Sequence, residues 1–151
     1  MANSVIIKNY LKVFEEYAAQ ATITPGHLLK LRSDGKVQAT DADQTTQLPM
    51  FATEDELQGK TITDNYSAND IVQCWIPQRG EVVNAILTTS QTIVIGDYLT
   101  SAGDGTLKKY EATTLTGSDS GTSIPDAKVI GQAVQAVTTT GSAARIKVRI
   151  I

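Results

Sequence analysis

Residues that commonly carry out chemistry are scarce in this chain. Its one histidine, His27, directly follows a turn glycine and has no cysteine, second histidine or paired carboxylates near it in the sequence, as a metal site or a catalytic triad would need. We therefore interpret His27 as a surface turn residue. The one cysteine, Cys74, can form no disulfide within the chain, and a small buried residue on a strand is the better interpretation than a nucleophile.

Three further patterns match chemical motifs only in part. Asp41 and Asp43 lack the turn glycine and the terminal glutamate of a calcium loop. Residues 103–105 are glycine-rich but lie between two expected strands, without the helix start that would hold a phosphate. Residues 117–121 carry Asp119 where a serine nucleophile would stand. The sequence therefore predicts no enzyme, no cofactor and no metal site.

The acidic run Glu54-Asp55-Glu56 follows Thr53 and resembles the start of a short helix. In a capping box, Thr53 would accept the main-chain N–H of Glu56, whose side chain would reach back to Thr53. Three carboxylates at a helix start ordinarily favour the helix dipole and are not a general acid and base. We predict one short helix over 54–58, ended by Gly59.

Two similar segments indicate how the chain is built. Residues 26–37 and 96–108 each read as a strand, an Asp-Gly turn (Asp34-Gly35 and Asp104-Gly105) and a returning strand, the strongest short-range signal of a β-hairpin. With more short strands around them, they predict one closed or nearly closed structure whose edges are paired or covered. We expect an all-β fold, a small β-barrel or β-tulip-like domain of hairpins with one short helix.

Further strands and loops follow from apolar runs and turn residues. Pro77 to Gly80 forms a four-residue reversal between two expected core strands, and residues 111–128, rich in Thr, Ser and Gly, form a long polar loop. The expected strands outside the two hairpins are 71–76, 81–87, 92–95, 129–137 and 144–151.

The chain of 151 residues has the length of one domain, which we divide into an N-terminal arm (1–20) and a barrel (21–151). Apolar residues of the arm fall at helical spacing but also suit an extended segment, which we favour slightly. A formal charge of −3 provides no basic footprint for nucleic acid. No stretch is apolar for long enough to cross a membrane, and no standard export signal precedes the barrel.

What remains are groups suited to contacts. An extended arm can add a strand to a neighbour's sheet edge, and the last strand alternates basic and apolar residues, so that its basic face either meets an acidic partner or is solvated. Trp75 and Arg79 are of types enriched at interface hot spots, although Trp75 fits a core equally well. The contact candidates are Val5, Ile6, Ile7, Tyr10, Leu11, Arg145, Lys147 and Arg149, with Trp75 and Arg79 as interface candidates.

A series of short motifs runs through the chain in a defined order: Ile23-Thr24-Pro25-Gly26 with Leu28, Leu29 and Leu31; Phe51-Ala52; residues 54–60; Asp64-Asn65-Tyr66; Ile76-Pro77 with Arg79-Gly80; Ile95-Gly96-Asp97 with Leu99; Ile130-Gly131-Gln132-Ala133; and Arg145 with Val148 to Ile151. From Ile6 onward this series resembles the capsid cement, or decoration, proteins of tailed bacteriophages.

The resemblance implies a β-barrel or β-tulip-like protein that is made in the host cytoplasm and forms a homotrimer on the outer surface of the virion. Its implied partner is the major capsid protein, of HK97-like fold, which it binds after head expansion at three-fold and quasi-three-fold positions. The arm would reach onto the capsid lattice. Neither nucleic acid nor a membrane is an expected direct partner.

A different class of function stays open, a β-sandwich recognition module that binds carbohydrate or a host surface. One tryptophan and five tyrosines limit the aromatic platforms for such a site without excluding it. A small hydrolase would need a pocket with a perturbed titratable group, which the sequence does not indicate.

Overall fold

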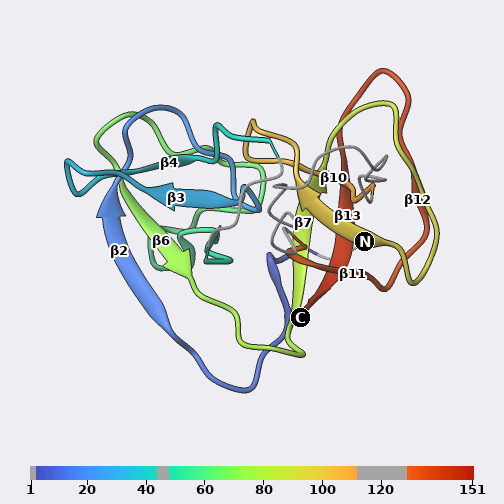
Figure 1. Cartoon of the computed structure of the whole chain (residues 1–151). Coiled ribbons are helices and arrows are strands. Elements are labelled where there is room, and N and C mark those ends of the chain that lie inside the picture. The colour runs from blue at the N-terminus through green and yellow to red at the C-terminus, as the bar shows by residue number, and fades with distance from the viewer. Residues whose placement is uncertain (1–2, 44–47, 112–128) are drawn as a thin grey trace, which may run out of the picture.

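The computed structural model describes residues 3–43, 48–111 and 129–151, and these residues form an almost entirely β structure (Figure 1). Five strands close into a barrel in the order β7-β10-β9-β11-β13, because β13 pairs back with β7. The all-β barrel expected from the sequence is thus confirmed. The barrel strands are β7 (Val82–Leu87), β9 (Tyr98–Ser101), β10 (Leu107–Lys109), β11 (Gly131–Ala133) and β13 (Ala144–Ile150).

The longest pairing of the barrel joins β7 and β13. It runs antiparallel from Ala144 opposite Leu87 to Arg149 opposite Val82. Alternate side chains of β13 point inward because successive residues of a strand face opposite sides. Ile146, Val148 and Ile150 are accordingly buried in the barrel core, and the basic residues between them face outward.

Smaller sheets lie beside the barrel, on the left in Figure 1. A second core lies among them, and Cys74 is buried in it, as expected. These sheets consist of β2 (Phe14–Ala18), β6 (Ile71–Trp75) and β5 (Phe51–Ala52) in one, β3 (Leu29–Leu31) and β4 (Val37–Ala39) in another; a further pair, β8 (Thr92–Ile93) with β12 (Val137–Thr138), lies next to the barrel.

Both predicted Asp-Gly hairpins are present. β3 pairs with β4, and β9 pairs with β10, in antiparallel register. Gly35 and Gly105 have φ angles of 77° and 81°, a left-handed conformation that glycine adopts without strain. The short turn signals therefore specified these two hairpins correctly.

The predicted capping box at Thr53 is wrong. The Thr53 hydroxyl donates to the Gln73 carbonyl, and no side chain caps the helix, which is the single 3₁₀ turn η1 (Glu56–Gln58). Pairing of this segment with β6 takes Thr53 out of the capping position. Gly59 does end the turn in the left-handed conformation, as predicted.

Residues 77–80 connect two core strands, but those strands do not pair with each other. β6 pairs with β2 and β5, whereas β7 belongs to the barrel. The reversal therefore links the two parts of the molecule instead of closing a hairpin. Among the described residues, no helix has the length and apolar content needed to cross a bilayer.

The described part of the expected arm is extended and paired. β1 (Ile6–Lys8) pairs with β7, and β2 pairs with β6 along its whole length. The helical alternative for this segment is wrong, and the segment belongs to two sheets instead of standing free. The polar loop predicted at 111–128 lies, apart from the exposed Glu111, outside the described residues.

Candidate functional site

Three distant parts of the chain meet at one end of the molecule, the lower end in Figure 1. They are the β1–β2 loop, the β6–β7 connection and the C-terminal end of β13. The N–H of Ile76 donates to the Val13 carbonyl at 3.0 Å, and the N–H of Gly80 donates to the Ile150 carbonyl at 2.8 Å. The first bond joins the β6–β7 connection to the β1–β2 loop, and the second joins it to β13.

Glu81 lies at the centre of this end. Its side chain is fully buried, one carboxylate oxygen accepts the N–H groups of Tyr10 and Leu11, and the other accepts the N–H of Gln78 at 2.6 Å. Burial by itself would raise the pKa of Glu81, but the donated N–H groups stabilise the carboxylate, and the net result is a pKa below its ordinary value. Glu81 is therefore a charged group that fastens two loops through main-chain donors.

Exposed apolar side chains lie directly on these fastened loops. Tyr10 and Leu11 keep 67% and 61% of their surface exposed although their N–H groups are bonded to Glu81. The Lys8 ammonium lies 5.1 Å from the centre of the Tyr10 ring, within cation–π range. The loop thus presents an aromatic ring and an aliphatic side chain to solvent next to a cation.

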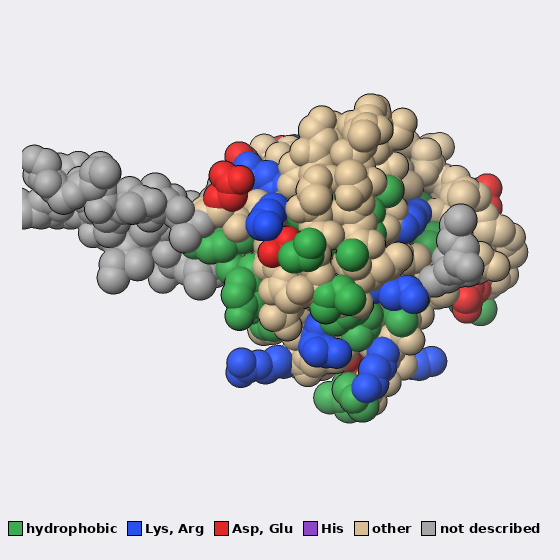
Figure 2. Space-filling model, turned by 90° about the vertical axis from the view of Figure 1, so that its right-hand side faces the viewer, with side chains coloured by type: hydrophobic (Ala, Val, Ile, Leu, Met, Phe, Trp, Pro, Cys, Tyr) green, Lys and Arg blue, Asp and Glu red, His purple; other side chains and the backbone are tan. Residues whose placement is uncertain are grey.

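Four exposed cations lie on or next to these same three segments: Lys8, Lys12, Arg79 and Arg149. None of them takes part in the ion pairs found among the described residues. Lys8 and Arg149 both stand opposite Val82, on its two sides, so the spacing of strands puts their Cα atoms about 10 Å apart. Figure 2 shows Lys and Arg side chains gathered around hydrophobic ones at the lower end of the molecule.

We call this surface the basic end and define it as residues 8–12 with Arg79, Arg149 and the exposed C-terminal Ile151. It unites members of three separate sets of candidates, namely Tyr10 and Leu11 from the N-terminal segment, Arg149 from the last strand and Arg79 from the connection. Lys8 and Lys12 were not among the predicted contact residues.

Other candidates lie elsewhere. Val5 and Trp75 are fully buried in the barrel core, so neither side chain exposes surface to a partner. Ile6 and Ile7 are half-buried on β1. Of the N-terminal candidates, therefore, only Tyr10 and Leu11 are well exposed.

The basic residues of β13 have different roles. Arg145 is half-buried, and its guanidinium donates to the Ile62 carbonyl at 2.9 Å and to the Asn84 carbonyl at 3.4 Å. Burial lowers the pKa of Arg145. Lys147 is half-buried, whereas Arg149 is exposed. Arg145 thus ties a loop to the barrel, and Arg149 is the member of this row that is free to contact a partner.

His27 is not the surface turn residue expected from the sequence. It is half-buried next to Gly105, and its Nδ1 accepts the N–H of Thr24 at 3.2 Å. Burial lowers the pKa of His27, with a smaller opposing effect from Asp104. The ring therefore stabilises the turn that precedes β3 from within.

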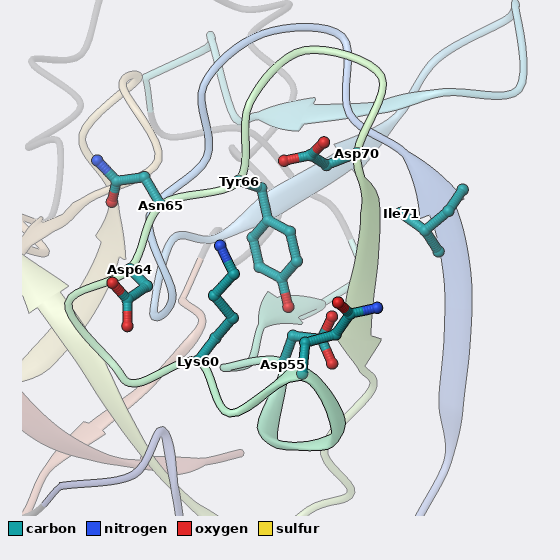
Figure 3. Close-up of a pocket in the computed structure, with 8 residues that line it drawn as sticks. Asp55, Lys60, Asp64, Asn65, Tyr66, Asp70 and Ile71 are labelled. Carbon is teal, nitrogen blue, oxygen red and sulfur yellow. The ribbon is translucent and has the colours of Figure 1, made fainter.

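A cavity of about 260 Å³ lies between η1 and β6 (Figure 3). Tyr66 forms one wall, and its hydroxyl donates to the Thr53 carbonyl at 2.7 Å, while burial raises its pKa to about 12. Lys60 extends beside the Tyr66 ring (Figure 3). The side chains of Gln58, Lys60 and Asn65, which also line the cavity, have no hydrogen-bond partner among the described residues.

Within residues 3–43, 48–111 and 129–151, no three His, Cys, Asp or Glu side chains are grouped so that they could hold a metal ion. Besides Lys8 and Lys12, sequence reasoning missed the bonding roles of the buried carboxylates of Glu81 and Glu54. Glu54 accepts the N–H of Val5 at 3.1 Å. In the sequence, each of these glutamates is visible only as an acidic residue beside an apolar run. Such a pattern does not indicate that the carboxylate bonds to a main-chain N–H group 49 or more residues away.

No protein-family model and no curated protein sequence matches this chain. Among solved structures, the chain is similar to the N base of the head fibre protein gp8.5 of bacteriophage phi29, with a TM-score of 0.57 and 17% sequence identity. The similarity covers 93% of this chain and 95% of the other. At this identity the likeness establishes a shared fold across nearly the full length of both chains.

Proposed function

We propose that this protein is a structural component of a bacteriophage head that binds the outer surface of the expanded capsid as a homotrimer. In this proposal it contacts the major capsid protein at three-fold and quasi-three-fold positions and stabilises the lattice as a cement protein. The observation that carries the proposal is the likeness to the base of a phage head fibre over nearly the full length of both chains.

Two further observations support it. The ordered motifs of the sequence resemble those of capsid decoration proteins, and the basic end presents unpaired cations around exposed apolar side chains, as a docking surface requires. An enzymatic function has no comparable support, because the site is built from main-chain contacts and surface side chains.

The mechanism follows from binding linkage. A trimer that touches several capsid subunits binds through linked contacts, so modest contacts of each chain combine into a high affinity. Because such a trimer binds the assembled lattice and not separated capsid subunits, it stabilises the lattice in proportion to its affinity and concentration. The heads therefore gain resistance to heat and to internal DNA pressure.

The test mixes the purified chain with expanded heads that lack decoration. We expect co-sedimentation that saturates near one chain for each major capsid subunit, and heads that withstand a higher temperature once saturated. Unexpanded heads serve as the control for lattice specificity. Absence of co-sedimentation over a wide range of salt concentration contradicts the proposal.

A second candidate function is glycan recognition at the cavity of Figure 3. Its support is a group of polar side chains, Gln58, Lys60 and Asn65, that line this cavity beside Tyr66 and have no hydrogen-bond partner among the described residues. A glycan array distinguishes the two, because saturable binding that is lost on Asn65→Ala and kept on Arg149→Ala favours recognition of carbohydrate.

A further inference from the structure

We propose that the basic end docks onto an acidic, partly apolar protein surface, and that Glu81 is the positioning residue that holds this docking surface in shape. The inference deepens the proposed function, on which it rests, by naming the contact face and the chemistry of its partner.

The first argument is the distribution of charge. The chain carries a formal charge of −3, so the four cations of the basic end leave −7 on the remainder. The Glu81 carboxylate at this end is buried and already accepts main-chain N–H groups, and none of the four cations forms an ion pair among the described residues. Positive charge is thus concentrated and unneutralised at one end of an acidic molecule, which favours an acidic surface there.

The second argument is the apolar centre. Tyr10 and Leu11 are more than half exposed and lie between Lys8 and Lys12 in the loop that Glu81 bonds to the segment of Arg79. Exposed apolar side chains next to charged ones are typical of protein interfaces. Tyrosine and arginine are also the residue types most often found at interface hot spots. The basic end therefore offers both an apolar contact and a charged rim.

The same distribution of charge indicates which class of partner can bind the basic end. A membrane or a long nucleic acid would extend past the basic end and meet the acidic remainder of the chain, where repulsion opposes binding. A protein partner can present acidic groups over the limited area of the basic end alone. We therefore assign the surface to a protein partner, which in the proposed function is a capsid subunit.

Glu81 explains how an exposed loop keeps a defined surface. Its two oxygens have different partners, one accepting from the β1–β2 loop and the other from the β6–β7 connection. A glutamine in its place would retain the volume but would have only one acceptor oxygen. Its NH₂ group would then face the main-chain N–H of one of the two loops, and two donors cannot form a hydrogen bond with each other. Tyr10, Leu11 and Arg79 would then lose the fixed arrangement that pre-organises them for binding.

The first experiment compares two double variants with equal charge change in co-sedimentation with expanded heads. Arg79→Glu with Arg149→Glu reverses two cations of the basic end, and Lys30→Glu with Lys36→Glu reverses two cations elsewhere. We expect the basic-end variant to bind at least 100-fold more weakly and with a smaller salt dependence, and the control variant to bind within threefold of the wild type.

Two outcomes distinguish failure of the docking-surface inference from failure of the proposed head-binding function. If the wild type binds heads and the basic-end variant binds equally well, the inference is overturned and the proposed function stands. If the wild type does not bind heads at all, the proposed function itself fails. Binding of the wild type to DNA or to phosphatidylserine vesicles, with loss in the basic-end variant, overturns the assignment to a protein partner.

The second experiment tests the positioning role with Glu81→Gln. Its folded state is checked by tryptophan fluorescence, and binding is measured at a temperature where it is folded. The control is Leu107→Ala, which weakens the barrel core on β10 and leaves the residues of the basic end unchanged. We expect Glu81→Gln to bind about tenfold more weakly with its salt dependence intact, since the four cations remain, and Leu107→Ala to bind normally. Normal binding by folded Glu81→Gln overturns the role. If Glu81→Gln does not fold, the docking surface is tested with Leu11→Ala, which keeps the main-chain bonds to Glu81. This variant must bind heads more weakly than the wild type, and normal binding overturns the docking surface.

Discussion

The carboxylate of Glu81 accepts the main-chain N–H of Leu11 at 2.9 Å, although 70 residues separate them in the sequence. Closing a loop of this length costs chain entropy, and a buried charged acceptor is among the stronger single contacts that can offset it. Glu81 thus fixes the N-terminal segment at the point where it crosses from the barrel to the second sheet.

The stability of the fold should depend on pH through Glu81. Its pKa is lowered in the folded state relative to an ordinary value of 4.5, so its contribution is fully present above that value and is lost as pH falls through the folded pKa. Thermal unfolding between pH 7 and pH 3 should show this loss in the acid range. Glu81→Gln should be less stable by about 2 kcal/mol at pH 7 and show a flatter dependence below pH 5. Equal acid sensitivity in both proteins would argue against this assignment.

Glu54 should hold the first strand in place. Its buried carboxylate accepts the N–H of Val5, and its replacement by glutamine removes the charge that makes this bond strong. We expect hydrogen exchange of residues 5–8 to become faster by one order of magnitude or more, while β6 exchanges as in the wild type. Uniform acceleration across the chain would instead indicate global destabilisation.

Arg145 and Arg149 lie on the same strand, but truncation of Arg145 should destabilise the fold much more than truncation of Arg149. Arg145→Met leaves the Ile62 carbonyl without its donor and should lower the free energy of unfolding by about 2 kcal/mol. Arg149 is exposed, so Arg149→Met should change stability by no more than about 0.5 kcal/mol. Urea unfolding of both variants measures the difference, and equal losses would contradict the distinction between them.

Gly131 should tolerate no side chain, whereas Gly141 should. A methyl group at Gly131 would lie 2.5 Å from the Arg149 carbonyl oxygen and 2.6 Å from a Val148 methyl, within the closed barrel. Gly131→Ala should therefore cost about 1–3 kcal/mol of stability. No atom lies within 4 Å of the same position at Gly141, which is not in the left-handed conformation, so Gly141→Ala serves as the control and should be neutral. A neutral Gly131→Ala would contradict the close packing of β11 on β13.

Local signals predicted the local structure. The Asp34-Gly35 and Asp104-Gly105 turns and the alternation along β13 were recognised because the determining residues lie within a few positions of each other. The connection at 77–80 was also recognised, but the sheets that it joins depend on which strands pair, and turn residues carry no information about that.

The site was less predictable than the fold. Tyr10, Leu11, Arg79 and Arg149 were named as contact candidates on separate grounds, but nothing in the sequence indicated that they share one end of the molecule. Their proximity depends on Glu81, whose partners are main-chain N–H groups that every residue except proline carries. A side chain that bonds to the main chain leaves no complementary residue type for sequence reasoning to detect.

The open surroundings of Gly141 suggest where a foreign peptide could be inserted. β13 starts at Ala144, shortly after this loop, and reaches the basic end at its other terminus, a span of about 20 Å for its seven residues. A peptide inserted beside Gly141 would therefore project from the β12–β13 loop, at the end of β13 opposite the one that carries Arg149. Figure 1 shows this loop at the upper end of the molecule. A tag fused after Ile151 would instead emerge among the docking residues. An insertion at Gly141 should therefore display a peptide without affecting docking, whereas a fusion after Ile151 should block docking.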